Sequence, residues 1–206
     1  MHFSQTVKAA LAALVAGFVL AGSALAQEDN PVPLSPQPAD GDLKPGIAVD
    51  YYYGFEGRHT DAARRLIDTT NGDPGEPIPM LNYNVGNDPM LTSTRNKHLV
   101  ADMSGAIYFK EPGTYKFVAM TNDGFDLDIG GAFILSDPTV HFDQWSDIET
   151  VEIAEPGWYD LQMVYFNRKG TATLELYWRP PWDKSEGDMQ LVPAEVFAHF
   201  PGGEPS

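Results

Sequence analysis

The stretch that decides the fold is residues 99–135, LVADMSGAIYFKEPGTYKFVAMTNDGFDLDIGGAFIL. Within it, residues 125–129 (FDLDI) alternate apolar and acidic side chains, the period of two that a β-strand produces. Gly-Gly at 130–131 then suits a two-residue hairpin turn, because glycine adopts positive φ freely. Residues 99–109 and 114–121 have strand composition on either side of a Glu-Pro-Gly turn.

The same succession of short strands and turns continues on both sides of that stretch. Further strands are predicted at 47–53, 132–135, 149–153, 158–166 and 171–178, with a short last stretch at 189–197. The unit of strand, Glu-Pro-Gly and Tyr-bearing strand occurs at 107–118 and again at 151–164, which suggests two similar hairpins or an internal repeat. Only residues 61–68 (DAARRLID) suggest a helix, and residues 70–89 suggest a long loop. Many short strands predict an all-β fold, an antiparallel β-sandwich.

The N-terminus has the pattern of a secretory signal peptide. Lys8 precedes an apolar run at 9–22, and Ser-Ala-Leu-Ala at 23–26 fits signal peptidase, so cleavage is expected after Ala26. The run is shorter than the roughly 20 apolar residues that span a bilayer, although an uncleaved anchor helix or a core helix is the alternative. We therefore expect a periplasmic or secreted protein with no transmembrane anchor in its mature chain.

Three parts follow the predicted signal peptide of residues 1–26. Residues 27–45 carry five prolines and no aromatic residue, so they are expected to form a disordered linker. Residues 46–200 are expected to be one β-sandwich domain, and residues 201–206 a flexible tail. A monomer is expected.

The net charge limits the possible partners, and the absence of cysteine limits how the fold can be stabilised. The chain has 29 acidic and 13 basic residues, and loss of Lys8 leaves 29 against 12, a net charge of −17. Such a field repels phosphate backbones, so nucleic acid is excluded as a partner, and it favours cations such as calcium. The chain has no Cys, so a hydrophobic core must supply its stability.

Motifs at the ends of the predicted strands occur in a fixed order along the chain. They are GIAVDYY at 46–52, GAIYF at 105–109, PGTYKF at 112–117, TNDGFDL at 121–127, PGWY at 156–159, VY at 164–165, GTATLELYW at 170–178 and VPAE at 192–195. Taken together, these motifs resemble the PA14 domain, a β-sandwich named after a bacterial toxin component. The resemblance covers about residues 46–197, most of the mature chain.

The resemblance implies a jelly-roll-like sandwich that acts as a binding module, found in adhesins, glycosidases and toxins. The family's best understood activity is calcium-dependent sugar binding. There, two consecutive aspartates joined by a cis peptide, with an Asn in a later loop, hold the ion, and sugar hydroxyls complete its coordination. By this resemblance the Asp pair falls on Asn122 and Asp123, and the loop residue is Asn167.

This sequence departs from the family pattern at the first of these positions. Asn122 stands where the lectins have Asp, so the implied calcium site of Asn122, Asp123 and Asn167 has one negative charge instead of two. The loop at 167–170 is also shorter than in the lectins, which puts its carbonyl ligands in doubt. Asn, Asp and Gly are equally typical of ordinary turns, so a purely structural role is the competing interpretation at both places.

Other candidate residues have simpler interpretations. Asp126 and Asp128 could form a D-x-D calcium motif, but an outward, solvated strand face is the expected role. Trp158 and Trp178 are in core-like register, whereas Trp145 and Trp182 lie in predicted loops. Of these, Trp145 is the candidate for lining a ligand-binding pocket, because an amphipathic ring can stack on a sugar.

Catalytic motifs are absent from the sequence. The five His residues (2, 59, 98, 141 and 199) have no metal-binding spacing, and there is no nucleophile elbow, Cys or phosphate-binding loop. A glycosidase pair among the many carboxylates is left open. The sequence therefore predicts a non-enzymatic, carbohydrate-binding module whose partner is a glycan or a cell-envelope component. The alternative is a structural or protein-interaction module of the cell envelope whose ligand loops have degenerated.

Overall fold

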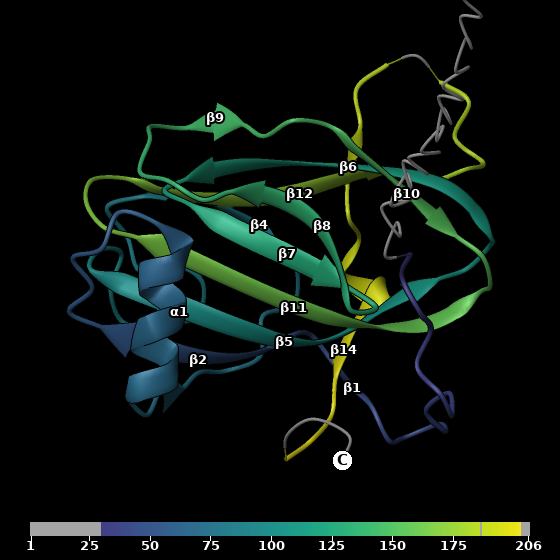
Figure 1. Ribbon diagram of the computed structural model, residues 1–206, viewed down its shortest axis with the longest axis horizontal. Helices are drawn as coiled ribbons and strands as arrows, with labels where there is room; N and C mark the ends of the chain where they lie inside the picture. The colour runs from purple at the N-terminus through teal and green to yellow at the C-terminus, as the bar shows by residue number, and fades with distance from the viewer. Residues whose placement is uncertain (1–29, 186, 203–206) are drawn as a thin grey trace, which may run out of the picture.

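Two antiparallel sheets form the molecule, and the first is built around two long strands that pair along their whole length (Figure 1). The computed structural model describes residues 30–185 and 187–202 of the 206. The long strands are β5 (Leu99–Phe109) and β11 (Gly157–Asn167). The others are β1 (Lys44–Pro45), β2 (Ala48–Tyr53), β3 (Asp73–Pro74), β7 (Phe125–Ile129), β8 (Ala132–Asp137) and β14 (Phe197–His199). Their order is β1-β14-β5-β11-β7-β8, and β2 pairs with both β5 and β3.

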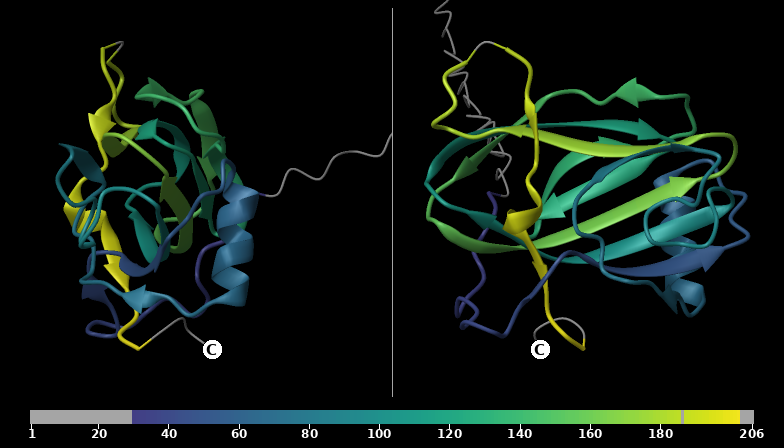
Figure 2. Two further views of the ribbon diagram at one scale, coloured as in Figure 1. Left: turned by 90° about the vertical axis from the view of Figure 1, so that its left-hand side faces the viewer. Right: turned by 180° about the vertical axis from the view of Figure 1, so that it is seen from behind.

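The second sheet has two central strands, β6 (Gly113–Asn122) and β12 (Ala172–Arg179). Its other strands are β4 (Asn82–Gly86), β9 (Gln144–Trp145), β10 (Glu149–Ile153) and β13 (Gln190–Leu191). The order is β10-β6-β12-β13, with β9 beside β6 and β4 beside β12. A 3-10 turn, Ala194–Val196, precedes β14. Seen end on in Figure 2, the two sheets face each other, and the predicted antiparallel sandwich is confirmed.

The core lies between the sheets, because each strand turns alternate residues inward. On β6, Tyr115, Phe117 and Ala119 are fully buried, while Lys116 between them is exposed. The apolar residues of β7 are equally buried, as their alternation predicted. Burial of a large apolar side chain stabilises the fold by roughly 1.5–3 kcal/mol, so these residues account for much of its stability.

The single α-helix of the described chain, α1 (Thr60–Thr69), covers the outer face of the first sheet (Figure 2). It includes the predicted residues 61–68. The helix begins after His59, whose Nδ1 accepts a hydrogen bond from the backbone N–H of Asp61 at 3.1 Å. Ala63 is fully buried and packs in a second apolar cluster that includes Tyr52, Phe55, Val100, Val164 and Phe166.

Eight connections of the described chain cross from one sheet to the other, which gives the sandwich its jelly-roll character. The Glu-Pro-Gly turns link β5 to β6 and β10 to β11, so the expected pair of hairpins is wrong: each turn joins strands of different sheets. At both turns a tyrosine reaches back by four residues. The hydroxyl of Tyr115 donates to the carbonyl of Glu111 at 2.9 Å, and that of Tyr159 donates to the carbonyl of Glu155 at 2.7 Å.

A true hairpin does occur between β7 and β8, as predicted. Gly130 and Gly131 have φ of 57° and 77°, the left-handed values that the turn requires. The predicted loop at 70–89 is wrong in part, because β4 lies within it and pairs with β12. Asn82 and Asn84 of β4 alternate with Tyr83 and Val85, which pack against the core, but this short alternation lies among Gly, Pro and Asn residues that indicate a loop.

The N-terminal segment differs from the expected disordered linker wherever the structure describes it. The backbone N–H of Val32 donates to Gly130 at 3.0 Å, and that of Leu34 donates to Trp158 at 2.8 Å. Lys44 and Pro45 form β1 against β14. Composition did not predict this, because the segment is held by hydrogen bonds to the sheet, including one from the Trp158 N–H to Gln37 Oε1 at 2.6 Å, and not by burial of apolar side chains.

The predicted signal peptide at 1–26 and the start of the linker lie outside the described residues. So do residues 203–206 of the predicted tail, after a turn at 201–202. Across the described part of the chain, no helix combines the length and apolar character needed to cross a bilayer.

Candidate functional site

Two of the crossing turns meet at one end of the sandwich, at the left in Figure 1. One follows β6 at residues 123–124, and the other follows β11 at residues 168–171. A backbone hydrogen bond from Phe166 N–H to the Gly124 carbonyl, 2.9 Å long, ties them together. Gly124 has no room for a side chain, because a Cβ there would lie 2.8 Å from Phe166 and 2.9 Å from the Asp137 carbonyl oxygen.

Asp123 is the centre of this end. Its side chain is 5% exposed and accepts two backbone hydrogen bonds, one on each carboxylate oxygen. Oδ1 accepts from His141 at 3.1 Å, and Oδ2 accepts from Arg168 at 2.8 Å. Since each carboxylate oxygen has two lone pairs, Asp123 clamps three loops together and keeps acceptor capacity for a ligand.

Asn122 precedes it through a cis peptide bond, the arrangement that the family resemblance implied for this pair. Its Nδ2 donates to Asp143 Oδ1 at 2.9 Å and to Thr171 Oγ1 at 3.1 Å. Its carbonyl accepts from the Tyr165 hydroxyl at 2.5 Å. Burial raises the pKa of Tyr165 well above its usual value, and the charges of Asp123 and Asp143 raise this pKa further, so the hydroxyl keeps its proton and remains a donor.

Asn167, at the end of β11, is fully buried. Its Nδ2 donates to the carbonyl of Asn96 and, at 3.3 Å, to that of Thr171. Its Oδ1 is buried and has no hydrogen-bond partner in the described part of the chain. A buried oxygen without a donor is costly, and a cation is one group that would satisfy it.

A hollow of about 310 Å³ opens at this end of the sandwich. Asn122 and Asp123 line it, whereas Asn167 does not and lies buried behind the adjoining loop. The other lining residues are Arg58, Val140, His141, Phe142, Lys169, Gly170 and Thr171. The structure therefore joins the three predicted ligands through hydrogen bonds around the 168–171 turn, although only two of them face the open space.

Sequence reasoning missed five polar residues that complete this end: Arg58, Asn96, His141, Asp143 and Thr171. They come from four loops, with His141 and Asp143 in the same one, and they carry no shared motif, because only the folded topology brings the loops together. Two of the lining side chains, Arg58 and Lys169, are basic and partly offset the charge of Asp123.

Calcium prefers oxygen ligands, and this end carries oxygens of that kind. Asp123 presents a carboxylate to the hollow, whereas the unpartnered oxygen of Asn167 is buried outside its lining. Among residues 30–185 and 187–202, no group of three or more His, Cys, Asp or Glu side chains is placed to hold a metal. Amide oxygens would therefore be needed in any such site.

Trp145 does not lie in this hollow. It is on β9, where its side chain is 53% exposed and its ring contacts Tyr177 edge to face at a centroid distance of 5.2 Å. It lines a different hollow on the outer face of the second sheet. The core-like assignment of Trp178 is confirmed, but that of Trp158 is wrong, because Trp158 packs on Tyr108 outside the core and its neighbour Tyr159 points inward.

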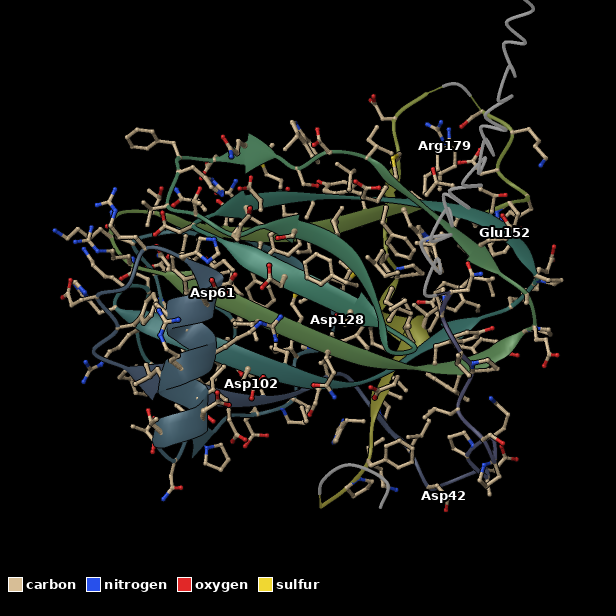
Figure 3. The ribbon with its side chains drawn as sticks, viewed as in Figure 1. Asp42, Asp61, Asp102, Asp128, Glu152 and Arg179 are labelled. Carbon is tan, nitrogen blue, oxygen red and sulfur yellow. The ribbon has the colours of Figure 1, made fainter. Side chains whose placement is uncertain are left out.

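Asp126 does not lie on a solvated strand face, as the sequence suggested. It is 5% exposed, and it accepts from Arg64 at 3.1 Å and from Ser136 at 2.7 Å. Arg64 Nη2 also lies 3.7 Å from Asp128, which Figure 3 shows beside α1. The contacts of Arg64 with Asp126 and Asp128 hold α1 to the first sheet, because α1 covers the face on which both acids lie.

The fold and the site define the class: a two-sheet β-sandwich whose polar site is built on loops at one end. The family model for the PA14 domain matches residues 79–191, more than half of the chain. The chain belongs to the PA14 domain family. A search of curated proteins finds no matching sequence.

Solved structures share the fold at low sequence identity. The PA14 domain of the MpAFP antifreeze protein has a TM-score of 0.66 and 14% identity, over 81% of this chain and 96% of that one. A PA14 sugar-binding domain from an RTX adhesin gives 0.60 and 14%, over 75% and 98%. The epithelial adhesin 9 A domain from Candida glabrata, in complex with Galβ1-4GlcNAc, gives 0.60 and 13%, over 83% and 96%.

Proposed function

We propose that this chain is an exported, lectin-like binding module that takes a glycan at the Asp123 hollow with the help of calcium. The observation that carries the proposal is the hydrogen bond from Arg168 N–H to Asp123 Oδ2 at 2.8 Å. This hydrogen bond joins the turn after β6 to the turn after β11. The sugar-binding interpretation requires these two turns to lie at one place. Solved relatives of the same fold include domains described as sugar-binding or crystallised with a disaccharide, which supports the same conclusion.

The residues have distinct roles in this proposal. Asp123 and the unpartnered Oδ1 of Asn167 would hold the ion, with Asn122 beside them. Bound calcium supplies open coordination positions that sugar hydroxyls can fill. Tyr165 keeps the Asn122 carbonyl in place, and Phe142, which is 90% exposed at the hollow's edge, offers an apolar surface to the sugar ring.

The test is a glycan-array measurement in calcium and in chelator. We expect binding in calcium that is lost in chelator and lost in Asp123→Ala. Because Asp123→Ala removes two hydrogen bonds of the fold, Asp123→Asn is the second variant, since it keeps the shape and one acceptor. Asp128→Asn is the matched control, because it makes the same chemical change outside the hollow. Equal binding with and without chelator would exclude the calcium role.

A second candidate is a metal-independent protein-interaction module. The lining by Arg58 and Lys169 favours it, because positive side chains beside a single carboxylate weaken the attraction for a cation. This function predicts retrieval of one protein partner that chelation leaves unchanged and that charge reversal at Lys169 abolishes.

A further inference from the structure

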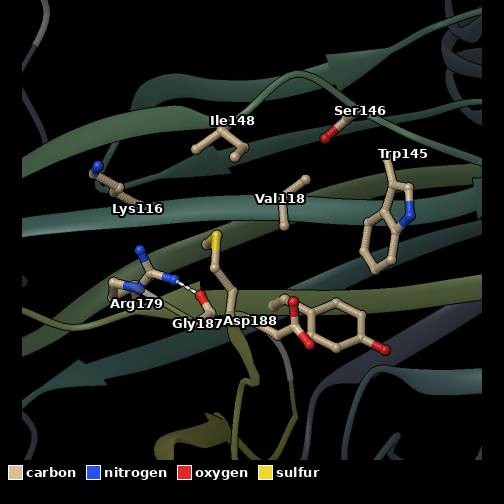
Figure 4. A pocket seen from close by; sticks show the side chains of 10 residues that line it. Lys116, Val118, Trp145, Ser146, Ile148, Arg179, Gly187 and Asp188 are labelled. Atoms are coloured by element: carbon tan, nitrogen blue, oxygen red, sulfur yellow. Dashed lines mark hydrogen bonds between the residues drawn. The ribbon is translucent and has the colours of Figure 1, made fainter. Parts of the chain in front are cut away.

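A second hollow, of about 650 Å³, lies on the outer face of the second sheet (Figure 4). Its floor is formed by outward side chains of β6 and β12, and its sides by residues 145–148 and 187–189. The side chains that matter below are Lys116, Val118, Trp145, Tyr177, Arg179 and Asp188. None of these lines the Asp123 hollow, so the two hollows are separate.

The floor places two cations side by side. Lys116 and Arg179 are direct partners in the antiparallel register of β6 and β12. Like charges opposite each other on one sheet face destabilise the pairing, and here they occur in a chain with 29 acids and only 13 basic residues. An anion placed between the two would relieve this repulsion.

None of the described carboxylates forms an ion pair with these two cations. Among the described residues, no ion pair joins Lys116 or Arg179 to a carboxylate, although Asp188 lines the same hollow. Arg179 Nη2 donates to the Gly187 carbonyl, and its Nε is buried without an acceptor in the described chain. At longer range, the pKa of Asp183 is lowered mainly by hydrogen bonds from Ser185 and to a lesser degree by the Arg179 charge.

The other end of the hollow is aromatic. Figure 4 shows Trp145 at one end and Lys116 and Arg179 at the other, with Val118 between them. Trp145 is 53% exposed and is held edge to face against Tyr177, so one face of its ring is available to a ligand. An exposed, fixed indole is a good surface for the apolar face of a sugar ring.

A peptide cannot bind in this hollow by adding a strand to β6 or β12. β6 lies between β10 and β12, and β12 lies between β6 and the β4 and β13 strands, so their backbone groups are already paired. Strand addition needs an exposed sheet edge. Recognition in this hollow must therefore use side chains, namely one aromatic face and two cations.

We propose that this hollow binds a uronate-bearing saccharide chain, with one sugar ring on Trp145 and the carboxylate of a neighbouring unit between Lys116 and Arg179. Arginine and lysine both form charge-assisted hydrogen bonds with carboxylates. The site requires no metal, and it is independent of the function proposed for Asp123.

The experiment measures binding of tetragalacturonate to the full-length chain by calorimetry, at low salt and with a chelator present. Its methyl ester, which has the same rings without charge, is the matched ligand. We expect the acid to bind, the ester to bind at least about tenfold more weakly, and binding of the acid to weaken as salt is raised.

Variants locate the site. Lys116→Glu is expected to weaken binding about tenfold or more, and Trp145→Ala about fivefold. The controls are Lys44→Glu, an exposed lysine on β1 of the other sheet, and Trp182→Ala, a tryptophan that is 44% exposed. Both should bind as the unchanged chain does.

Three results would overturn the proposal: no binding of the acid, equal binding of acid and ester, or unchanged affinity in both Lys116→Glu and Trp145→Ala. Asp123→Asn separates this proposal from the calcium site. It should abolish calcium-dependent glycan binding and leave tetragalacturonate binding in chelator unaltered.

Discussion

Both ends of the sandwich carry turns that lead the chain from one sheet to the other, and the turns are held by different contacts at each end. At the Glu-Pro-Gly end, each turn is closed by a tyrosine of its own strand, four residues away, and the surrounding contacts are aromatic. At the Asp123 end, hydrogen bonds join residues that are far apart in the sequence, as in the 45-residue separation between Arg168 and Asp123. The N-terminal segment adds longer-range hydrogen bonds at the Glu-Pro-Gly end, from Leu34 N–H to the Trp158 carbonyl and from Trp158 N–H to Gln37. The turns themselves are closed by local contacts at that end and by a network between loops at the other.

This difference separates stability from binding. A local contact satisfies its own groups and leaves nothing for a ligand. The network at the other end buries Asn122, Asp123 and Asn167, and it leaves one amide oxygen without a partner. Partly satisfied polar groups are where a bound group gains most, which supports the proposal that the Asp123 end binds the ligand.

The largest expected effect is that of Asp123→Ala. It removes the acceptor for two backbone N–H groups and leaves both without a partner, so we expect the free energy of unfolding to fall by about 3 kcal/mol. Urea unfolding checks it, with Asp40→Ala, an exposed acid, as the control. A loss below that of the control would mean that the three loops do not depend on Asp123.

The same chemical change at both ends sharpens the comparison. Tyr165→Phe and Tyr159→Phe each remove one hydrogen bond and should each cost about 1 kcal/mol of stability. Only Tyr165→Phe should also weaken glycan binding, because Tyr165 holds the Asn122 carbonyl. Parallel unfolding and binding measurements decide this, and equal effects on binding would remove the distinction between the ends.

Alkaline pH should test the aromatic end. Burial raises the pKa of Tyr115 to about 12, partly opposed by its hydrogen bond to Glu111. The folded state then keeps a proton that the unfolded state loses near pH 10, so stability falls as pH rises from about 10 to 12. Burial also raises the pKa of Tyr51 to about 12 and that of Tyr165 well above its usual value, so absorbance titration should show several late phenolates, one fewer in Tyr115→Phe. Titration of every tyrosine near pH 10 in the folded protein would contradict the prediction.

The smallest effect is expected at Asp128. Burial raises its pKa, Arg64 opposes this and Asp126 adds to it, so the folded state binds the proton more tightly than the unfolded state. Stability should therefore fall as pH rises above the ordinary value of 3.8. Asp128→Asn should make the pH profile flatter there and change stability at neutral pH by no more than about 0.5 kcal/mol. Thermal unfolding across this range measures both.

The strands could be predicted from the sequence where alternation is strict. β7 and β10 have the predicted bounds, because their inward residues are apolar and their neighbours polar. β5 also has the predicted bounds, although Val100 on its other face is apolar and buried. β4 was missed because the alternation of Asn82 and Asn84 with two core-packed residues is short and lies in a stretch rich in Gly and Pro. The pairing of residues 30–45 also depends on the sheet edge that receives them, which no local pattern contains.

The site could be predicted in its turns and not in its surroundings. The Asn-Asp-Gly turn and Asn167 were found because a family resemblance places them, and the structure brings them together. Arg58, His141 and Asp143 could not be found, because they reach the site from loops, before α1 and between β8 and β9, that only the fold brings to this end. Asp126 was misplaced because alternation shows which side a residue faces and does not show that a helix covers that side.

Titration of calcium into the metal-free chain by calorimetry tests the central claim most directly, which is that Asp123 and Asn167, with Asn122 beside them, offer their oxygens to one shared ion. The account predicts one calcium bound per chain, loss of this binding in Asp123→Asn, and unchanged binding in Asp128→Asn. No heat of binding by the unchanged chain, or equal binding by Asp123→Asn, would contradict it.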